Sequence, residues 1–571
     1  IGGTISFVGA GTVNGTTATT FRNVNINAGA VNIPIGATIP LVAGSLQING
    51  GNLTNPPKYG SASTLIYNTS YDRYVEWNYV GIGTIATSAG YPNNVTIADG
   101  TFDVYNNATG EARACNGTLT INNDAILNCN NMNSTLTVGD NLVIAIDGSF
   151  NMNTMSAALI VNDNISISGT LSLSTDFNGS LYLGGNWTRN STGTFIPNSR
   201  AVFFIGSADQ TITLTGGGIE SFPYFCIDKQ NAGTYVMPDN SIGNQTDLNI
   251  SGTSGNVLQL LNEGGLDLNG RSCTIVSNNI VSIQVTGGER NIISSIDTGL
   301  FIIAGAAFPP TPFVNSSDIT STLVFDSGVR IELNGGFNFS EKISTVNGTL
   351  RINSGAYVTG FAPLYGMGSR LQYYTNGVFN RTIEWGEAAD QGYPYNVQIS
   401  KNSTLSPGGS SNTGIVLNLA NDLTIDAGSE LTMNYAGNNM MVPLIVGNDI
   451  LINGELTLSD QINGDVKVGG AWTRNSTTGN FYPQERAAFF NGSSLQTISV
   501  SPSGTETFDY LIIDNSGAGV SLSATDIQVN DILTLSNGLV NTGSNEVYVA
   551  NNAGMAITGY QTDPAAPNLA N

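Results

Sequence analysis

"DNLVIAIDGSFNM" (Asp140–Met152) precedes "DNISISGTLSL" (Asp163–Leu173), which in turn precedes "GNWTRNSTGTF" (Gly185–Phe195). The first two stretches place apolar residues at alternate positions, and all three contain a turn with glycine. Apolar residues at every second position predict a strand with one buried face, whereas a helix would need a period near 3.6 residues. The three stretches therefore predict short strands joined by tight turns.

The interval between such stretches is nearly constant. Asn141, Asn164 and Asn186 occupy the same place in successive stretches and are 23 and then 22 residues apart. In the later half of the chain, Asp422 and Asp449 mark the same place at a slightly longer interval. A strand–turn–strand unit of roughly 22–27 residues, repeated without a helix, is typical of a β-solenoid. We therefore predict an all-β fold, a parallel β-helix (β-solenoid) built from tandem modules.

Stacking brings equivalent residues of neighbouring coils together. Coils of a solenoid lie about 4.8 Å apart, so that at about 24 residues per coil the whole chain would make a rod on the order of 110 Å long. Asn141, Asn164 and Asn186 are then expected to form a ladder in which side-chain amides hydrogen bond from coil to coil. Solvated turn residues without a ladder are the alternative.

A longer repeat is superimposed on the coil. "GGNWTRNSTGTF" recurs almost three hundred residues later as "GGAWTRNSTTGNF". The stretches that begin each module are "TFRNVNINAGAV", "SFPYFCIDKQNAGTYV" and "TFDYLIIDNSGAGV". We predict module 1 at residues 1–217, module 2 at 218–503 with an insertion at about 276–364, and the start of a truncated module 3 at 504–571. A structural coil near the end of each module explains the repetition better than a catalytic motif, which seldom needs two copies.

Composition argues against several function classes. The formal charge is −23, from 41 acidic and 18 basic residues, and we therefore expect no nucleic-acid partner. No apolar run approaches the roughly 18 residues of a membrane span, so we expect no membrane insertion. Histidine is absent, which removes the commonest general base and metal ligand. We expect a protein that is not an enzyme. Because the chain begins with Ile1, we also expect a processed product or a piece of a longer protein.

The cysteines do not form a recognisable metal or redox motif. Cys115, Cys129, Cys226 and Cys273 contain no CxxC pair. Cys115 and Cys129 are close enough in sequence to be candidates for a disulfide bridge. Cys226 stands where the third module has Ile512, which favours a buried thiol that packs as a small apolar side chain.

An Arg-x-x-Glu-Trp element occurs in each of the first two modules, as "RYVEW" and "RTIEW". An acidic side chain beside an aromatic platform is one way to bind or cleave a sugar. The structural alternative is an Arg–Glu ion pair that fixes a bend, with the tryptophan packed beneath it. The residues concerned are Arg73, Glu76, Trp77, Arg381, Glu384 and Trp385.

Two further sets of repeated residues are candidate sites. Asp140 and Asp163 are expected to stack, as are Asp422 and Asp449, and stacked carboxylates are stable when Ca²⁺ neutralises them. Turn-capping aspartates exposed to water are the alternative, and we expect no other cofactor. Trp187 and Trp472 occupy the equivalent coil of modules 1 and 2, either as packing residues or as ligand contacts.

The module pattern resembles the large repetitive surface proteins of Bacteroidota that are exported by the type IX secretion system, in particular gliding-motility adhesins of the SprB kind. The likeness is carried by "GGNWTRNSTGTF…AVFFIGSADQTI…SFPYFCID", by its later counterpart "GGAWTRNSTTGNF…AAFFNGSSLQTI…TFDYLIID", by "RTIEWGE…GYPYNVQIS" and by "DILTLSNGLVNTGSNEVYVAN". It covers most of the chain outside the insertion. The resemblance implies an extracellular, cell-surface location.

These observations lead to one main functional hypothesis and one alternative. The main hypothesis is a non-catalytic extracellular shaft or filament segment of a large cell-surface adhesin, which acts by extension and display. The alternative is a β-helix protein that binds or cleaves a polysaccharide. Surface glycans, other cell-surface proteins and self-association into a filament are the partners considered. A shaft should carry equivalent residues in every module, whereas a ligand site should make one module chemically unique.

Overall fold

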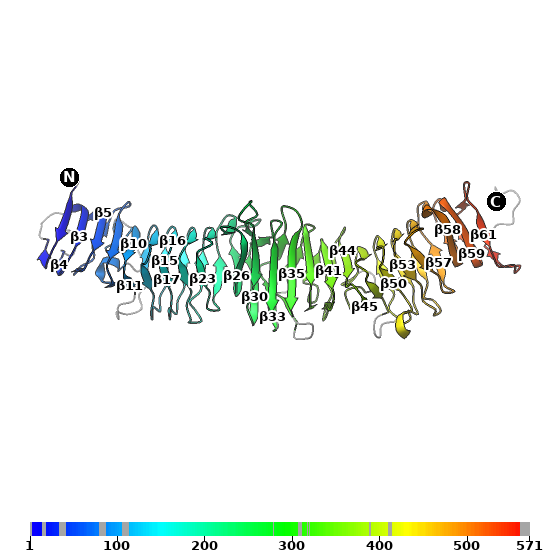
Figure 1. Cartoon of the computed structure of the whole chain (residues 1–571), viewed down its shortest axis with the longest axis horizontal. Coiled ribbons are helices and arrows are strands. Elements are labelled where there is room, and N and C mark those ends of the chain that lie inside the picture. Colours follow the sequence, from blue (N-terminus) through cyan, green and yellow to red (C-terminus); the bar gives the residue numbers. More distant parts are fainter. Residues whose placement is uncertain are drawn as a thin grey trace. The chain divides into compact units, whose positions relative to one another are not determined.

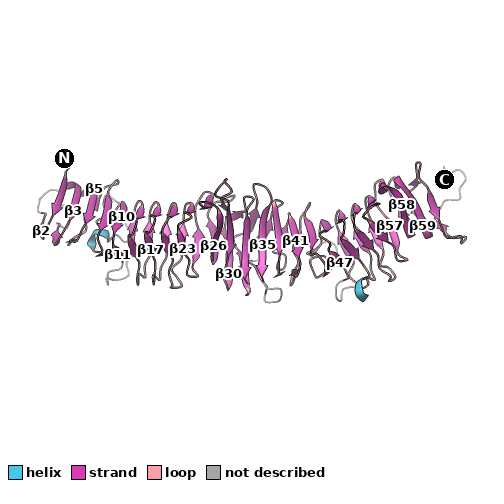
Figure 2. Cartoon of the chain, in the orientation of Figure 1, coloured by secondary structure: helices cyan, strands magenta, loops and turns pink. Residues whose placement is uncertain are grey.

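The computed structural model describes residues 3–13, 19–33, 41–78, 87–104, 113–277, 279–305, 311–316, 318, 320–386, 390–408 and 414–559. Within these residues the protein is all-β, and its helical elements are two single 3₁₀ turns, η1 (Val75–Trp77) and η2 (Tyr435–Gly437) (Figure 2). The chain divides into two compact units. Unit 1 comprises Ile1–Val276 and Val281–Arg290, and unit 2 comprises Ser277–Ile280 and Asn291–Asn571.

Unit 1 is a stack of coils whose short strands pair in parallel (Figure 1). The first sheet contains β3 (Thr20–Ile26), β5 (Leu41–Ile48), β8 (Thr64–Asn68), β10 (Asn94–Asp99), β13 (Leu119–Ile121), β16 (Leu142–Ile144), β19 (Ile165–Ile167), β22 (Trp187–Arg189) and β25 (Gln210–Leu214). The second contains β9 (Tyr71–Asp72), β11 (Thr101–Asp103), β14 (Ile126–Asn128), β17 (Ser149–Asn151), β20 (Thr170–Ser172) and β23 (Thr194–Ile196). The third contains β12 (Arg113–Cys115), β15 (Leu136–Val138), β18 (Leu159–Val161), β21 (Leu181–Leu183), β24 (Ala201–Phe204), β27 (Tyr224–Lys229) and β30 (Gly255–Asn262). The predicted β-solenoid is confirmed.

The strand register places like side chains over like. Leu119 pairs with Leu142, Leu142 with Ile165 and Ile165 with Trp187, so that each pairing advances the chain by one coil. All four side chains are buried. Each coil therefore covers the apolar face of the one before it, and this burial of stacked apolar surface is the main favourable contribution to stability.

Unit 2 is built in the same way (Figure 1). One run of paired strands contains β35 (Gly299–Gly305), β38 (Val329–Leu333), β41 (Thr349–Asn353), β44 (Arg370–Tyr374), β46 (Asn396–Ile399), β49 (Leu423–Ile425), β52 (Ile450–Ile452), β55 (Trp472–Asn475), β58 (Gln496–Asp514) and β59 (Val520–Asn537). A second contains β45 (Val378–Asn380), β47 (Thr404–Ser406), β50 (Glu430–Thr432), β53 (Glu455–Thr457) and β56 (Asn480–Tyr482). A third contains β48 (Leu417–Leu419), β51 (Leu444–Val446), β54 (Val466–Val468) and β57 (Ala487–Phe490).

The insertion predicted at about 276–364 contributes coils of the solenoid. Val329 pairs with Gly299, whereas Leu350 pairs with Ile331, so that the first of these coils is much longer than the second. One lies above the predicted range of coil lengths and the other below it. The expected coil length is therefore wrong for this segment, because its turns differ in length while the strands keep their pairing. The boundary predicted between residues 503 and 504 falls inside the continuous strand β58.

Glycine is required where neighbouring coils approach most closely. A Cβ added at Gly169 would lie 2.1 Å from the carbonyl oxygen of Gly148, and one added at Gly193 would lie 2.2 Å from that of Ile167. Because those obstacles are backbone atoms, no side-chain movement relieves the clash. The glycine in each repeated stretch therefore permits the turn to stack directly on the coil below.

The four cysteines are free and buried. The disulfide considered between Cys115 and Cys129 is therefore not formed. Burial raises the pKa of the Cys115 thiol to about 12, and it raises the pKa of Cys129 as well. Cys226 is a buried, apolar-like residue as predicted.

Candidate functional site

The predicted asparagine ladder is present in unit 1. Asn164 donates to Asn141 Oδ1 from Nδ2 at 3.0 Å and from its backbone nitrogen at 3.2 Å. The backbone nitrogen of Asn186 donates to Asn164 Oδ1 at 2.8 Å, and that of Thr211 donates to Asn186 Oδ1 at 2.8 Å. The step common to every rung is thus a side-chain oxygen that accepts a backbone N–H of the next coil, and amide–amide bonding is added at the first rung only.

Aspartate takes over this role in unit 2. The backbone nitrogen of Asp449 donates to Asp422 Oδ1 at 3.1 Å, and that of Ala471 donates to Asp449 Oδ1 at 2.7 Å. One oxygen is all that the rung requires, so a carboxylate serves as well as an amide. Asp422 and Asp449 therefore act as acceptors between coils.

Asp140 and Asp163 lie on adjacent coils beside the ladder. Asp140 accepts from Asn141 Nδ2 at 2.8 Å and from Thr118 Oγ1 at 3.3 Å. Desolvation, followed by the nearby Asp140 carboxylate, raises the pKa of Asp163. Across the residues that the structure describes, no group of three or more cysteine, aspartate or glutamate side chains is arranged to hold a metal ion.

The first Arg-x-x-Glu-Trp element forms a buried cluster around η1. Arg73 Nε donates to the carbonyl oxygen of Val104 at 2.7 Å, and its Nη1 donates to that of Trp77 at 2.9 Å. Glu76 Oε1 instead accepts from Tyr67 Oη at 2.9 Å and from the backbone nitrogen of Tyr74 at 2.9 Å. Burial raises the pKa of the Glu76 carboxyl, and its Oε2 has no hydrogen-bond partner among the described residues.

The second element repeats this arrangement. Arg381 donates from Nε to the carbonyl oxygen of Pro407 at 2.6 Å and from Nη1 to that of Trp385 at 2.6 Å. Glu384 Oε1 accepts from Tyr373 Oη at 3.0 Å, and its Oε2 accepts from the Thr382 hydroxyl. Burial lowers the pKa of the Arg381 guanidinium.

These two clusters correct the ion-pair interpretation. In both copies the arginine binds main-chain carbonyl oxygens and the glutamate binds a tyrosine hydroxyl. The glutamate and the tryptophan are 0% exposed in each copy, and the two arginines are 4% and 3% exposed. The indole nitrogens donate to the carbonyl oxygens of Ala114 at 2.9 Å and Asn418 at 2.7 Å. A sugar would find no open surface on these side chains, so the clusters hold a bend in place.

Trp187 and Trp472 belong to a different kind of cluster. The register places Arg189 over Ile167 and Arg474 over Ile452, at positions that face the core in the preceding coils. Each arginine therefore needs a buried acidic partner. Arg189 Nε lies 2.8 Å from Glu220 Oε2.

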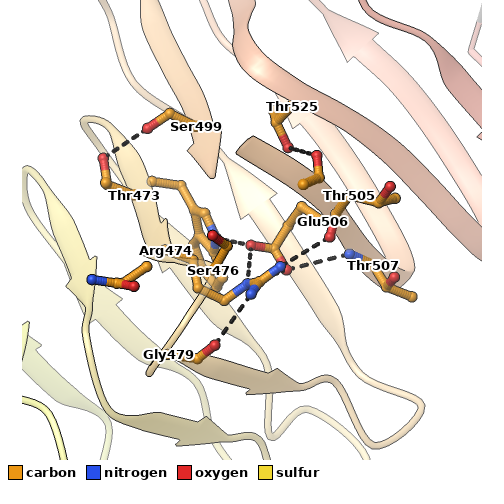
Figure 3. Close-up of polar contacts among 12 residues, drawn as sticks. Thr473, Arg474, Ser476, Gly479, Ser499, Thr505, Glu506, Thr507 and Thr525 are labelled. Carbon is orange, nitrogen blue, oxygen red and sulfur yellow. Dashed lines mark hydrogen bonds and ion pairs between the residues drawn. The ribbon is translucent and has the colours of Figure 1, made fainter. Parts of the chain in front are cut away.

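The second copy is drawn in Figure 3. Arg474 Nε lies 2.9 Å from Glu506 Oε2, Nη2 donates to the carbonyl oxygen of Thr505 at 2.9 Å, and Nη1 donates to that of Gly479 at 3.1 Å. Trp472 Nε1 donates to Glu506 Oε2 at 3.1 Å. Burial raises the pKa of Glu506 and of Glu220, and in each case the neighbouring arginine opposes the rise.

Trp187 shows a small difference from Trp472. Its Nε1 has no hydrogen-bond partner among the described residues, although its closeness to Glu220 opposes the rise in the pKa of that carboxyl. Both tryptophans are fully buried and pack edge-on against phenylalanines, Phe195 and Phe481 respectively. Both are packing residues, and neither presents a surface to a ligand.

A glutamine beside each Trp–Arg–Glu cluster was not anticipated. Gln210 donates from Nε2 to the carbonyl oxygen of Leu183 at 3.0 Å, and its Oε1 accepts from the backbone nitrogen of Gly206 at 2.9 Å. Gln496 makes the corresponding bonds to Val468 at 2.9 Å and Gly492 at 2.9 Å.

We call each buried glutamine and its hydrogen-bond partners the glutamine nest. The residue that donates to the glutamine Oε1 differs between the two copies. Lys229 Nζ donates to Gln210 Oε1 at 2.9 Å and to the carbonyl oxygen of Ala208 at 2.7 Å. Asn515 Nδ2 donates to Gln496 Oε1 at 2.9 Å and to the carbonyl oxygen of Ser494 at 2.7 Å. Burial lowers the pKa of Lys229 to about 8.

Sequence signals for these residues existed. A glutamate stands directly before the openings of the second and third modules, in "ESF" and "ETF", and the glutamines recur in "DQTI" and "LQTI". The partners are far apart in the sequence, however, so that only the coil stacking shows that they meet.

Comparison of the chain with protein-family models, with curated protein sequences and with solved structures finds no match. In the part of the chain that the structure describes, no helix has the length and apolar character needed to cross a membrane.

Proposed function

We propose that the chain is an extracellular structural shaft or filament segment of a large cell-surface adhesin, and that it acts by extension and display without catalysis. The observation that carries the proposal is the repeated use of the same ionisable side chains for the same structural task. Both Arg-x-x-Glu-Trp clusters are closed to solvent, and both Trp–Arg–Glu clusters join successive coils.

Two further features support a shaft. A solenoid gains its stability from contacts between neighbouring coils, so it can be lengthened by adding modules without a new core. The net charge of −23 also disfavours lateral association of identical shafts, because like charges repel. The resemblance to type IX-exported surface proteins motivates the cell-surface location.

The alternative is a polysaccharide-cleaving β-helix enzyme. Such an enzyme needs ionisable groups that converge on an open surface, where a sugar can reach them. The acidic residues of the four repeated clusters are buried against tyrosine, tryptophan and arginine. This arrangement favours the shaft.

The test uses cells that produce the protein and an antibody raised against the purified chain. The proposal predicts labelling of intact cells, removal of the label by external protease, and no release of reducing sugar when the purified chain is incubated with acidic or neutral polysaccharides. Labelling that appears only after the cells are permeabilised would contradict the location. Release of reducing ends that is lost in Glu76→Gln or Glu384→Gln would establish the enzyme instead.

A further inference from the structure

An open groove of unit 2 is lined by charged residues, and the equivalent described residues of unit 1 do not carry the same charges. It has a volume of about 500 Å³ and is formed by β38, β41, β44 and the turn after β46. Its charged and aromatic lining residues are Glu332, Arg351, Tyr374 and Lys401. We name this feature the Arg351 groove.

The arrangement of cations distinguishes this groove. Arg351 lies with its guanidinium carbon 4.4 Å from the centre of the Tyr374 ring, and Lys401 Nζ lies 4.5 Å from the same centre. Arg351 belongs to the coil before Tyr374, and Lys401 to the coil after it. The electron-rich Tyr374 ring thus contacts two cations, one from each neighbouring coil, in a chain that has few basic residues.

Part of this charge remains available to a ligand. Arg351 uses Nε to bind Gln372 Oε1 at 2.8 Å and Nη1 to bind Glu332 Oε1 at 3.2 Å. Lys401 is exposed, and its Nζ has no hydrogen-bond acceptor among the described residues. Arg330 Nε also lies 2.8 Å from Glu332 Oε1, so one carboxylate is shared by two guanidinium groups. The cations around the groove therefore outnumber its acid.

Unit 1 provides the matched comparison. Tyr67 and Tyr373 are equivalent because each binds the glutamate of its cluster and each pairs with an isoleucine of the preceding coil. From this anchor the strand register matches Arg351 with Gln47, because both residues directly precede that isoleucine.

The same alignment assigns the other lining residues. Glu332 matches Asn25, and Tyr374 matches Asn68. Lys401 lies two residues beyond Ile399, as Asp99 lies two residues beyond Ile97, the isoleucines that pair with Tyr373 and Tyr67. Amide side chains, together with Asp99, occupy this surface in unit 1, where Asn49 Nδ2 donates to Asn27 Oδ1 at 2.7 Å and Gln47 Nε2 donates to Asn49 Oδ1 at 2.7 Å. The amide bond is kept in unit 2 as Asn353 Nδ2 to Asn334 Oδ1 at 2.8 Å, while the residues around it have become charged or aromatic.

The shape indicates an extended ligand. The groove crosses four successive coils, which at about 4.8 Å per coil is a span of roughly 14 Å. That length suits about three residues of a linear polymer better than it suits a single small ion. Both cations lie against the Tyr374 ring. The ring therefore serves to position Arg351 and Lys401 rather than to stack against a sugar ring.

We infer that the Arg351 groove binds an acidic polysaccharide through its carboxylate groups. Arginine and lysine supply charge-assisted hydrogen bonds to carboxylates. The side chains of Asn334 and Asn353 supply donors and acceptors for sugar hydroxyls. This binding site goes beyond the shaft function and does not depend on it, because a shaft needs no charged groove.

The test is titration of the full chain with polygalacturonate, with dextran of similar length and inorganic phosphate as comparison ligands. We expect saturable binding of polygalacturonate that weakens as salt is added, and at least tenfold weaker binding of dextran and phosphate. Arg351→Gln and Lys401→Asp install the residues found at the matching positions of unit 1. Each is expected to weaken binding at least tenfold. Lys401 has a φ of 55°, a conformation that aspartate tolerates well.

The control variant is Lys342→Asp, which makes the same charge change on an exposed lysine outside the groove. It is expected to change binding less than twofold. Circular dichroism and thermal unfolding, compared with those of the unaltered chain, verify that each variant is folded. Absence of polygalacturonate binding, equal binding of dextran or phosphate, or full binding by folded Lys401→Asp would each overturn the inference.

Discussion

The two Trp–Arg–Glu clusters have the same ion pair but different neighbours. Beside Arg189 and Glu220, the glutamine nest is completed by the ammonium of Lys229, whereas beside Arg474 and Glu506 it is completed by an amide of Asn515. The acceptors are equivalent in both copies, namely a glutamine oxygen and a carbonyl oxygen. The nest thus requires a donor of suitable reach, whereas the arginine at a core-facing position requires a carboxylate.

The largest effect is expected from removing that carboxylate. Glu506→Ala and Glu220→Ala each leave an arginine largely buried without its counter-charge, which destabilises by about 3–5 kcal/mol. Denaturant unfolding measures the loss, and Glu341→Ala, at an exposed glutamate, is the control. Equal stability of Glu506→Ala and the control would show that the ion pair does not hold the coils together.

The next largest effect is a dependence of stability on pH, which only the glutamine nest that contains Lys229 should show. The pKa of Lys229 is about 8 in the folded protein, against an ordinary value of about 10.4 in the unfolded chain. Between these values the unfolded chain binds more protons, so stability rises with pH, by up to about 3 kcal/mol. Below pH 8 the full cost of the buried charge is present.

The reciprocal exchange isolates this effect. Lys229→Asn is expected to abolish the rise in stability between about pH 8 and pH 10, and Asn515→Lys is expected to introduce one. Thermal unfolding across that range provides the measurement, and all other titrating groups cancel in the difference between variants. An unchanged pH profile in both variants would refute the assigned pKa.

A smaller and unequal effect is expected in the Arg-x-x-Glu-Trp clusters. Tyr67→Phe leaves Glu76 with the Tyr74 amide alone, whereas Tyr373→Phe leaves Glu384 with the Thr382 hydroxyl and amide. We expect a loss of about 2 kcal/mol in the first case and about 1 kcal/mol in the second, because a buried acceptor is costly to leave unpaired. Denaturant unfolding of both variants tests the order, and a reversed order would contradict it.

The smallest effect is expected in the ladder. Asn164→Ala removes the acceptor of one rung and should cost about 1 kcal/mol. Asn164→Asp keeps that acceptor, as Asp449 does in unit 2, and should cost less. Hydrogen exchange of the Asn186 amide reports the rung directly. Equally fast exchange in both variants would show that the side-chain oxygen is not the acceptor.

The sequence predicted the coils but not the partners of the charged residues. The apolar alternation and the Asn141–Asn164–Asn186 spacing were sufficient for the strands, the stacking and the ladder, since all of these depend on residues one coil apart. An ion pair between Arg73 and Glu76 that fixes a bend was the structural alternative to a sugar site. In the structure, Glu76 instead accepts a hydrogen bond from Tyr67, and Arg73 donates to the carbonyl oxygen of Val104, because the bend turns the two side chains toward different coils.

The Arg351 groove was also beyond the sequence pattern. Its lining residues are spread along the chain from Glu332 to Lys401, and the turns between them vary in length. Their alignment with Asn25, Gln47, Asn68 and Asp99 depends on strand register, which repeats alone do not fix when coils differ in length.

Electron microscopy of the purified chain tests the central claim most directly. A shaft made of coils stacked at about 4.8 Å predicts thin rods on the order of 110 Å long. Compact particles, combined with turnover of a polysaccharide, would contradict the shaft.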